Sequence, residues 1–325
     1  MTSSYKQVLV TGASGFLGSE IVSIVREAGW QVRAFDQNRR MQIEGVDTFV
    51  GDIGDTAMLR KASEGVSAIV HAAGLAHVFG SGAGDSARFN AVNEGGTASV
   101  VDAALQSNVP HVVLVSSVSV YGSYSGTKCD ESVPCHPQGP YATSKWRSEL
   151  RATERMSTGK SSLTILRFAT IYGEGDRGNV AKLIGALDRG RFLWPGSGVN
   201  QKSLIYKKDA ARACLHALER PVFGTEVFNV SARPVTMREI VSSICQALDR
   251  PVPRHKIPLS LLKISGAIAR KIGDPGNLNQ RLQKFIQDDV YDGAKFESMF
   301  GFRPAVSLSE GIRREVDYLQ YKETR

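Results

Sequence analysis

Cysteine is scarce in this sequence, and its few copies are scattered along the chain. They form no CxxC pair and have no histidines at a metal-ligand spacing; the positions are Cys129, Cys135, Cys214 and Cys245. Such spacing argues against a zinc site and against a disulfide framework. We therefore expect free thiols in a reducing compartment and no metal ion.

Long apolar runs are also missing. No segment reaches the roughly 18 uninterrupted apolar residues that a membrane-spanning helix needs. The opening MTSSYKQVLVTG lacks the basic and apolar regions of a signal peptide. The most apolar helical stretch is 257–272, and its basic residues form no broad face. We predict a core or lid helix there, with a membrane-surface helix as the alternative. A cytoplasmic protein without a membrane span is expected.

A basic arm or stripe is absent too, although the formal net charge is +8. The tightest basic clusters are pairs such as Arg39–Arg40 and Lys207–Lys208. Nucleic-acid-binding domains usually concentrate their cations on one face or along one helix. Incidental surface charge is the simplest explanation, and a phosphate-bearing small ligand is favoured over nucleic acid.

The sequence does have a regular alternation of short apolar runs and helical stretches, in 325 residues of ordinary globular composition. The expected strands are Gln7–Thr11, Gln31–Asp36, Thr48–Val50, Ala68–His71, His111–Ser116 and Leu163–Phe168. The expected helices between them are Phe16–Ala28, Thr56–Ser63, Glu94–Gln106 and Tyr141–Met156. This alternation predicts an α/β fold, a Rossmann-type doubly wound parallel sheet with helices on both faces.

From about residue 175 the alternation loosens, and glycine and proline interrupt it. Two further helices are expected there, Asp209–Leu218 and Thr236–Leu248. We predict a dinucleotide-binding domain over 1–174 that carries the catalytic residues. Residues 175–325 are predicted to form mainly a smaller C-terminal substrate-binding subdomain, with crossings of the chain between the two.

The segment TGASGFLG lies between an expected strand and an expected helix. In that position Gly12 permits a sharp turn, Gly15 leaves room for a pyrophosphate, and Gly18 lets the helix approach the strand. Asp36 ends the next strand, where a carboxylate accepts hydrogen bonds from the adenosine ribose. Three packing glycines and a strand-end aspartate are the alternative, but the combined context favours a dinucleotide.

The residues around Asp36 bear on which dinucleotide binds. A carboxylate at this position repels the 2′-phosphate of NADP, so NAD is favoured. Arg39 and Arg40 follow closely and keep NADP as the second choice.

Two hydroxyls and a lysine are candidates for the chemistry. Tyr141 and Lys145 are four residues apart in an expected helix and so share one face. A cation beside a phenol favours the phenolate, which makes Tyr141 a candidate general base. Ser117 follows an apolar strand, at the strand end where ligands of α/β sheets bind. Taken singly, these residues are equally explained as a solvated helix pair and a polar strand end.

Taken together and in this order, the motifs resemble the extended short-chain dehydrogenase/reductase family, in its nucleotide-sugar epimerase branch. The likeness covers nearly the whole chain. Besides the glycine turn, Ser117 and YATSK, it rests on GDIGD (51–55), HAAG (71–74), LRFATIYGEGDRGN (166–179) and FGFRPAVSLSEGI (300–312).

The resemblance implies a role for each matching position. Ser117, Tyr141 and Lys145 become the catalytic hydroxyl, base and orienting lysine. The implied cofactor contacts are Gly12, Ser14, Gly15, Phe16, Leu17, Gly18, Asp36, Asp52, Ile53, Ala72, Ala73, Gly74, Asn93, Ser116, Tyr141, Lys145, Phe168 and Thr170. The implied substrate contacts are Ser117, Ser119, Tyr141, Thr170, Arg177, Lys202 and Arg281.

The sequence departs from the family pattern at several of these positions. Val118 and Ser119 replace the acid pair that sugar dehydratases carry after the catalytic hydroxyl, so dehydration is disfavoured. Thr170 stands where epimerases commonly have asparagine. Lys202 stands where an arginine is expected, and a lysine lacks the fork that binds a diphosphate bidentately.

The resemblance therefore implies an NAD-dependent 4-epimerase of a nucleotide-diphosphate sugar, in which a hydride leaves a sugar carbinol and returns to the opposite face. A homodimer joined through helices around 94–106 and 141–156 is also implied. The alternatives are an NAD(P)-dependent reductase or dehydrogenase of a keto sugar or hydroxysteroid-like substrate, and a non-catalytic protein that senses NAD.

Overall fold

The computed structural model describes residues 6–76, 83–124, 128–157, 159–257 and 285–323. Two predictions, the helix over 257–272 beyond its first residue and the substrate contact Arg281, lie outside the described residues. Within the described residues, no helix combines the length and the apolar character that crossing a membrane requires.

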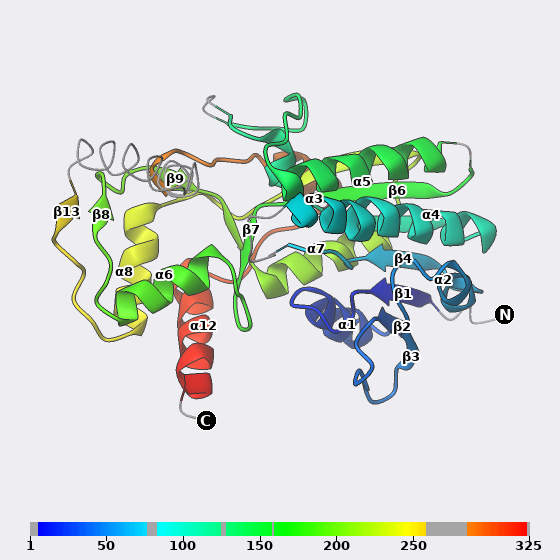
Figure 1. The fold of residues 1–325 in the computed structure, drawn as a ribbon, viewed down its shortest axis with the longest axis horizontal. Helices are drawn as coiled ribbons and strands as arrows, with labels where there is room; N and C mark the ends of the chain where they lie inside the picture. Colours follow the sequence, from blue (N-terminus) through cyan, green and yellow to red (C-terminus); the bar gives the residue numbers. More distant parts are fainter. Residues whose placement is uncertain (1–5, 77–82, 125–127, 158, 258–284, 324–325) are drawn as a thin grey trace.

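Seven parallel strands form the central sheet, in the order β11-β6-β5-β4-β1-β2-β3 (Figure 1). The strands are β1 (Gln7–Thr11), β2 (Gln31–Asp36), β3 (Asp47–Val50), β4 (Ala68–His71), β5 (His111–Ser117), β6 (Ser162–Phe168) and β11 (Thr225–Val230). The order reverses direction beside β1, as in doubly wound dinucleotide-binding sheets. The predicted fold class is thus confirmed, and six predicted strands are present with ends that differ by at most one residue.

Helices cover both faces of this sheet. On one face α1 (Gly18–Glu27) lies beside α7 (Lys207–Glu219), and their apolar sides pack on β1 and β6. The opposite face carries α2 (Thr56–Ser63), α4 (Gly96–Gln106) and α5 (Pro140–Met156). Strands β1 and β4 to β6 are therefore buried on both sides, which explains their continuous apolar runs.

Three predicted helix starts are wrong by two residues, and one of them is that of α7, which begins at Lys207 instead of Asp209. Helix α1 begins at Gly18 instead of Phe16, because the glycine turn occupies the residues before it. Helix α4 begins at Gly96 instead of Glu94, after α3 (Ala83–Phe89) and a π-helical turn over Asn90–Gly95. Such π-turns often occur at functional sites, and Asn93, one of the implied cofactor contacts, lies within this one.

The second half of the chain divides its residues between the sheet and a smaller unit. Both α7 and the unpredicted strand β11 belong to the sheet, and α11 (Ala294–Phe300) packs on β11. The chain thus crosses back to the sheet after residue 175, and the edge strand β11 pairs in parallel with β6.

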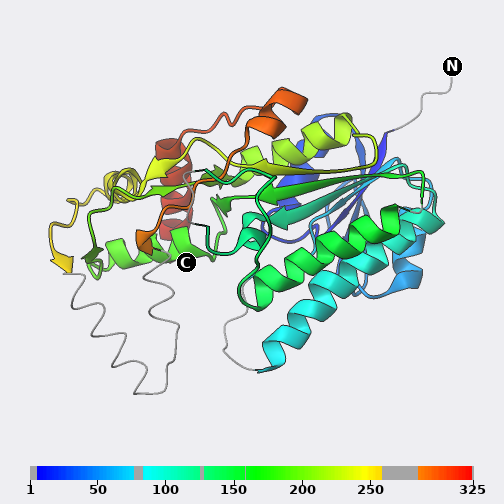
Figure 2. The same ribbon diagram turned by 90° about the horizontal axis from the view of Figure 1, so that it is seen from above.

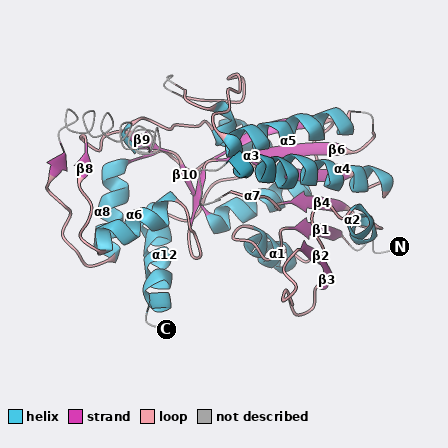
Figure 3. Ribbon diagram, in the orientation of Figure 1, coloured by secondary structure: helices cyan, strands magenta, loops and turns pink. Residues whose placement is uncertain are grey.

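The smaller unit is mostly helical (Figure 3). Its apolar core joins α6 (Asn179–Asp188), α8 (Met237–Ala247) and α12 (Leu308–Glu323). Three pairs of short strands accompany them: β7 (Thr170–Tyr172) with β10 (Leu204–Tyr206), β8 (Trp194–Pro195) with β13 (Lys256–Ile257), and β9 (Gln201–Lys202) with β12 (Val235–Thr236). The carboxyl ends of the sheet strands point toward this unit (Figure 2).

Candidate active site

The glycine turn has the geometry that its sequence predicts. Gly12 has a φ of +70°, and a Cβ added there would lie 2.6 Å from the backbone of Ala73. A Cβ on Gly18 would lie 1.9 Å from the carbonyl oxygen of Gly12. At Gly15 only the Gly12 oxygen comes within 4 Å of an added Cβ, at 3.0 Å. The first and third glycines are therefore required by packing, and the second is exposed, with one close backbone contact.

The turn is suited to hold the diphosphate of a dinucleotide. The residue before α1, Leu17, gives no side-chain cap, so the first amides of the helix have no side-chain acceptor there. An anion beside these amides also meets the positive end of the helix dipole. The residues present thus fit NAD, whose diphosphate Gly15 and the start of α1 would hold.

Asp36 lies directly beside this turn. Its Oδ2 accepts a hydrogen bond from the Ser14 amide at 3.0 Å, and its Oδ1 accepts one from the Asn38 amide at 3.0 Å. The side chain is partly exposed, while Arg39 and Arg40 are exposed. A fixed carboxylate at this position can accept further hydrogen bonds from a ribose.

Replacement of Asp36 tests the prediction of NAD over NADP. In Asp36→Ala we expect NAD affinity to fall about tenfold, because hydrogen bonds to a charged group are lost. NADP affinity should change less, since Arg39 and Arg40 remain and a repulsive charge is gone. Titration calorimetry with both dinucleotides measures the ratio, and Asp47→Asn on β3 is the control. An unchanged NAD-to-NADP ratio would contradict the assignment.

Asp52 and Ile53, the predicted adenine contacts, follow β3. The Asp52 Oδ1 accepts a hydrogen bond from the Gly54 amide at 2.8 Å, which fixes the turn before α2. Ile53 is buried, and a Cβ on Gly96 would lie 2.7 Å from its side chain. The two residues therefore lie in a turn that these contacts fix, and their contact with the adenine stays a prediction.

Asn93 connects the segment after β4 to α5. Its side chain accepts from the Leu75 amide at 2.8 Å and donates to the Leu75 carbonyl at 3.1 Å and to Ser144 Oγ at 2.9 Å. A Cβ added to Gly74 would lie 3.1 Å from Asn93 Oδ1 and 3.9 Å from Lys145 Nζ. The predicted cofactor residues after β4 are thus brought next to the predicted catalytic lysine.

Ser117, Tyr141 and Lys145 meet at the carboxyl end of β5. Ser117 lies close enough to Tyr141 to lower the pKa of the phenol. The Ser117 Oγ also accepts from the Ser119 amide at 3.2 Å, and Lys145 Nζ donates to the Val115 carbonyl at 2.6 Å. The helix face predicted from the four-residue spacing therefore faces the strand that carries the serine.

Burial controls the charges of this group. It raises the pKa of the Tyr141 phenol, and the nearby Ser117 side chain lowers it. Burial also lowers the pKa of Lys145 to about 8, although the charge of the Glu149 carboxylate acts in the opposite direction and raises it. The pKa of His71 falls to about 3, first through burial and then through the nearby Lys145 charge. At neutral pH the site thus holds a lysine cation next to a neutral histidine.

His71 was not among the predicted site residues, although it begins the HAAG motif. Its Nδ1 lies 2.7 Å from Thr11 Oγ1, and its Nε2 lies 3.1 Å from Thr97 Oγ1. The ring therefore joins β1, β4 and α4 beneath the glycine turn. The sequence signal that could have identified His71 is a single polar residue at the end of an apolar run.

Other predicted contacts at the strand ends differ in what their side chains do. Ser116 Oγ donates to Glu149 Oε1 at 2.5 Å, so its hydroxyl is turned into the protein. Phe168 pairs with Ser117 across the sheet, but its ring is buried in the core. Thr170 is exposed at the start of β7. Ser119 Oγ is buried and, among the described residues, has no hydrogen-bond partner.

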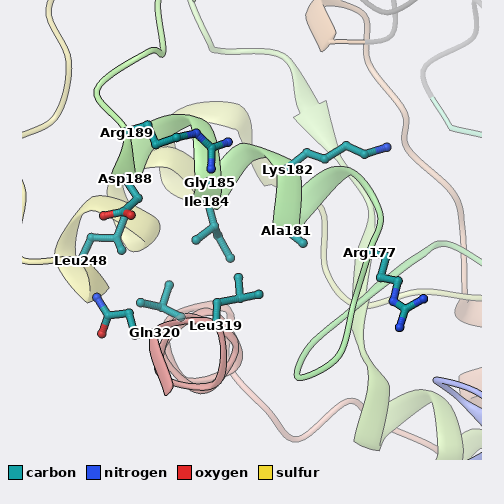
Figure 4. Close-up of a pocket in the computed structure, with 11 residues that line it drawn as sticks. Arg177, Ala181, Lys182, Ile184, Gly185, Asp188, Arg189, Leu248, Leu319 and Gln320 are labelled. Atoms are coloured by element: carbon teal, nitrogen blue, oxygen red, sulfur yellow. The ribbon is translucent and has the colours of Figure 1, made fainter. Parts of the chain in front are cut away.

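Two of the three cations proposed for substrate binding, Lys202 and Arg177, lie within the described residues. Lys202 is buried, and its Nζ lies 2.6 Å from Asp289 Oδ2. Arg177 is exposed at one end of a groove of about 300 Å³ between α6 and α12, lined also by Ile184, Leu248 and Leu319 (Figure 4). Neither Tyr141 nor Ser117 lines this groove. Both cations stay predictions as substrate contacts.

The described residues contain no group of three or more His, Cys, Asp or Glu side chains arranged to hold a metal ion. The glycine turn and the Ser117, Tyr141 and Lys145 group instead define a class of enzymes that transfer a hydride with a bound dinucleotide.

Known proteins that are similar to this chain belong to the same class. The model of the NAD dependent epimerase/dehydratase family matches residues 8–231. The chain is 29% identical over 319 residues to N-acetyl-alpha-D-glucosaminyl-diphospho-ditrans,octacis-undecaprenol 4-epimerase of Escherichia coli O157:H7, covering 96% of this chain and 94% of that protein. It is also 29% identical over 328 residues to 2-alkyl-3-oxoalkanoate reductase of Stenotrophomonas maltophilia (strain K279a), covering 95% and 98%. The structure of MoeE5 in complex with UDP-glucose and NAD superposes with a TM-score of 0.77 at 26% identity, covering 98% and 99% of the two chains.

This chain belongs to the NAD dependent epimerase/dehydratase family. The resemblance found in the sequence motifs is thereby confirmed, as are the enzyme class and NAD as the cofactor.

Proposed function

We propose that the protein is an NAD-dependent 4-epimerase of a nucleoside diphosphate sugar. The observation that carries the proposal is the placement of Tyr141 beside Ser117 and one helical turn from the Lys145 cation, at the strand end beside the glycine turn. This arrangement can take a proton from a secondary alcohol and return it.

The chain's own residues account for the proton part of the reaction. Tyr141 removes the proton of the sugar hydroxyl, while Ser117 orients that oxygen through hydrogen bonds. The Lys145 ammonium stabilises the negative charge on the phenol oxygen. NAD, when bound, takes up the hydride from the sugar carbon and gives it back. Once the keto sugar has turned its other face, Tyr141 protonates the new alkoxide and the 4-epimer results.

Dehydration remains disfavoured by the residues near Ser117. Val118 is buried and apolar, and Ser119 is a hydroxyl, so neither gives the acid that loss of water needs. The buried carboxylate of Glu149 already forms an ion pair with Arg167. Proton transfer at the carbinol is thus the chemistry that these side chains can support.

Cofactor turnover separates the epimerase from its alternatives. An epimerase returns the hydride, so we expect the sugar to change while the absorbance of reduced cofactor shows no net increase. Product analysis by NMR, run beside absorbance at 340 nm as the usual NADH wavelength, gives both readings. Stoichiometric NADH would instead support a dehydrogenase. NAD binding without any turnover would support a non-catalytic NAD-sensing protein.

The panel of substrates in this experiment follows from the relatives. It starts with UDP-glucose, which is bound in the MoeE5 structure. A polyprenyl diphosphate N-acetylhexosamine is included because the Escherichia coli relative is a 4-epimerase of such a compound. A 3-keto acid is included because another relative is a 2-alkyl-3-oxoalkanoate reductase. Its reduction with consumption of NADH would favour the reductase.

We further infer a homodimer that associates through α4 and α5, which lie side by side on the outer face of the sheet. We also place the protein in the cytoplasm, since its four cysteines are free thiols. An epimerised sugar nucleotide there would be a precursor for polysaccharide biosynthesis.

A further inference from the structure

A buried carboxylate lies one helical turn beyond the catalytic lysine. Glu149 continues the four-residue spacing of Tyr141 and Lys145 along α5, so all three side chains lie on the face that packs on the sheet. The Glu149 side chain is 3% exposed and that of its partner, Arg167 on β6, is 5% exposed. Neither residue is among the predicted site residues.

The two side chains bind each other at several atoms. Arg167 Nε lies 3.1 Å from both oxygens of Glu149, and its Nη2 lies 2.7 Å from Oε2. Ser116 Oγ donates to Oε1 at 2.5 Å. Ser116 pairs with Arg167 in the register of β5 and β6, and Ser117 is the next residue. The carboxylate therefore ties α5 to both strands at the level of the catalytic serine.

Arg167 extends this contact to a distant part of the chain. Its Nη1 donates to Tyr121 Oη at 2.9 Å, and the Tyr121 hydroxyl donates to Asn229 Oδ1 at 2.8 Å. Asn229 Nδ2 donates to the Cys129 carbonyl at 3.2 Å. One arginine thus joins the catalytic helix to the turn after β5 and to the edge strand β11.

Stability alone is a weak reason for such a pair. Removing two charges from water costs as much as their attraction returns, and apolar side chains of similar volume are often no worse. What a buried ion pair does provide is a fixed charge and a fixed position. Both bear on Lys145, which lies between the pair and the Tyr141 phenol along the helix face.

We propose that Glu149 and Arg167 are a positioning pair that holds Lys145 against β5 and maintains its charge beside Tyr141. The inference rests on the proposed function for its catalytic meaning, although the charge of Lys145 can be measured without any substrate. Neither residue touches the reacting atoms, so both act through the lysine.

The charges facing Lys145 come from several elements. Tyr141 and Glu149 face it from its own helix, and neutral His71 faces it from β4. Arg167 on β6 compensates the Glu149 charge. Loss of Glu149 removes a supporting anion and leaves a cation uncompensated, whereas loss of Arg167 leaves the anion uncompensated. The two single variants should therefore move the Lys145 titration in opposite directions.

The experiment follows the titration of Lys145 by NMR in protein labelled with carbon-13 at the lysine Cε. The signal is assigned by its loss in Lys145→Met. The wild-type midpoint is expected near the Lys145 pKa of about 8. Glu149→Gln should lower it by about one unit, since an opposite charge at short range is worth at least that much. Arg167→Met should raise it, and the double variant should titrate between the two single variants.

Glu154→Gln is the matched control, because Glu154 lies on the same helix with its side chain 68% exposed. Its midpoint should stay at the wild-type value. In the active enzyme, the alkaline limb of the kcat profile should shift with the Lys145 midpoint in each variant. If Arg167→Met does not fold, the double variant must still titrate above Glu149→Gln.

Two results would overturn the proposal: midpoints that equal the wild type in all variants, or shifts of the same sign in both single variants. Either would mean that the pair only holds the fold. A substrate that is not a sugar nucleotide would instead contradict the proposed function, and it would leave the NMR titration unaffected.

Discussion

Tyr141→Phe should lose about a thousandfold in kcat while it still binds NAD. The variant keeps the ring, which contacts Phe89 edge to face with centroids 6.0 Å apart, and removes only the hydroxyl that meets Ser117. General acid–base catalysis by one positioned group typically contributes between about a hundredfold and ten-thousandfold. Conversion of a sugar nucleotide, measured by NMR, gives the rate, and calorimetry gives NAD affinity.

Tyr321→Phe is the control for this prediction, because its side chain is 56% exposed on α12. It should have wild-type activity. Undiminished turnover in Tyr141→Phe would exclude Tyr141 as the base. Loss of NAD binding together with activity would show that the substitution disturbs the cofactor site instead.

Gly12→Ala should abolish measurable NAD binding and destabilise the protein. Two costs coincide at Gly12. Its φ of +70° strains any residue with a Cβ, at about 1–2 kcal/mol. In addition, the new Cβ would meet the Ala73 backbone at 2.6 Å, which a side-chain rotation cannot relieve. The turn or the end of β4 must shift, and both are predicted cofactor contacts.

Gly29→Ala separates these two costs. Gly29 also has a positive φ, +84°, but no atom lies within 4 Å of an added Cβ. We expect only the backbone cost of about 1–2 kcal/mol there, with NAD binding unchanged. Thermal unfolding and NAD titration of both variants measure the difference. Equal loss of stability and equal NAD affinity in the two variants would contradict the close contact between the turn and β4.

Much of the site could be predicted because it depends on short spacings. Tyr141 and Lys145 are four residues apart, so they share one face in any α-helix. The glycine turn needs a positive φ and a close packing that only glycine permits. Ser117 was found from the apolar run before it, because strand ends of parallel sheets meet at one edge. These are local properties, and the neighbours along the chain determine them.

The predictions are wrong or stay untested where contacts between residues distant in the sequence determine the structure. The helix starts at Phe16 and Glu94 were wrong because the glycine turn packs against Ala73 and the π-turn bonds to Leu75 and Ser144 through Asn93, all distant in the sequence. The strand β11 was missed because TEVFNV is short and lies after the loosened pattern. No hydrophobic periodicity in the sequence reveals that this strand pairs with β6.

The sequence by itself determined the fold class, the glycine turn and the shared helix face of Tyr141 and Lys145, since each follows from backbone geometry and helix periodicity. Only the tertiary structure decided what the buried charges do. It pairs Lys202 with Asp289, 87 residues away, and Glu149 with Arg167 from another strand. Burial makes an unpaired charge costly, so each must find a partner, and which partner lies within reach is set by the fold.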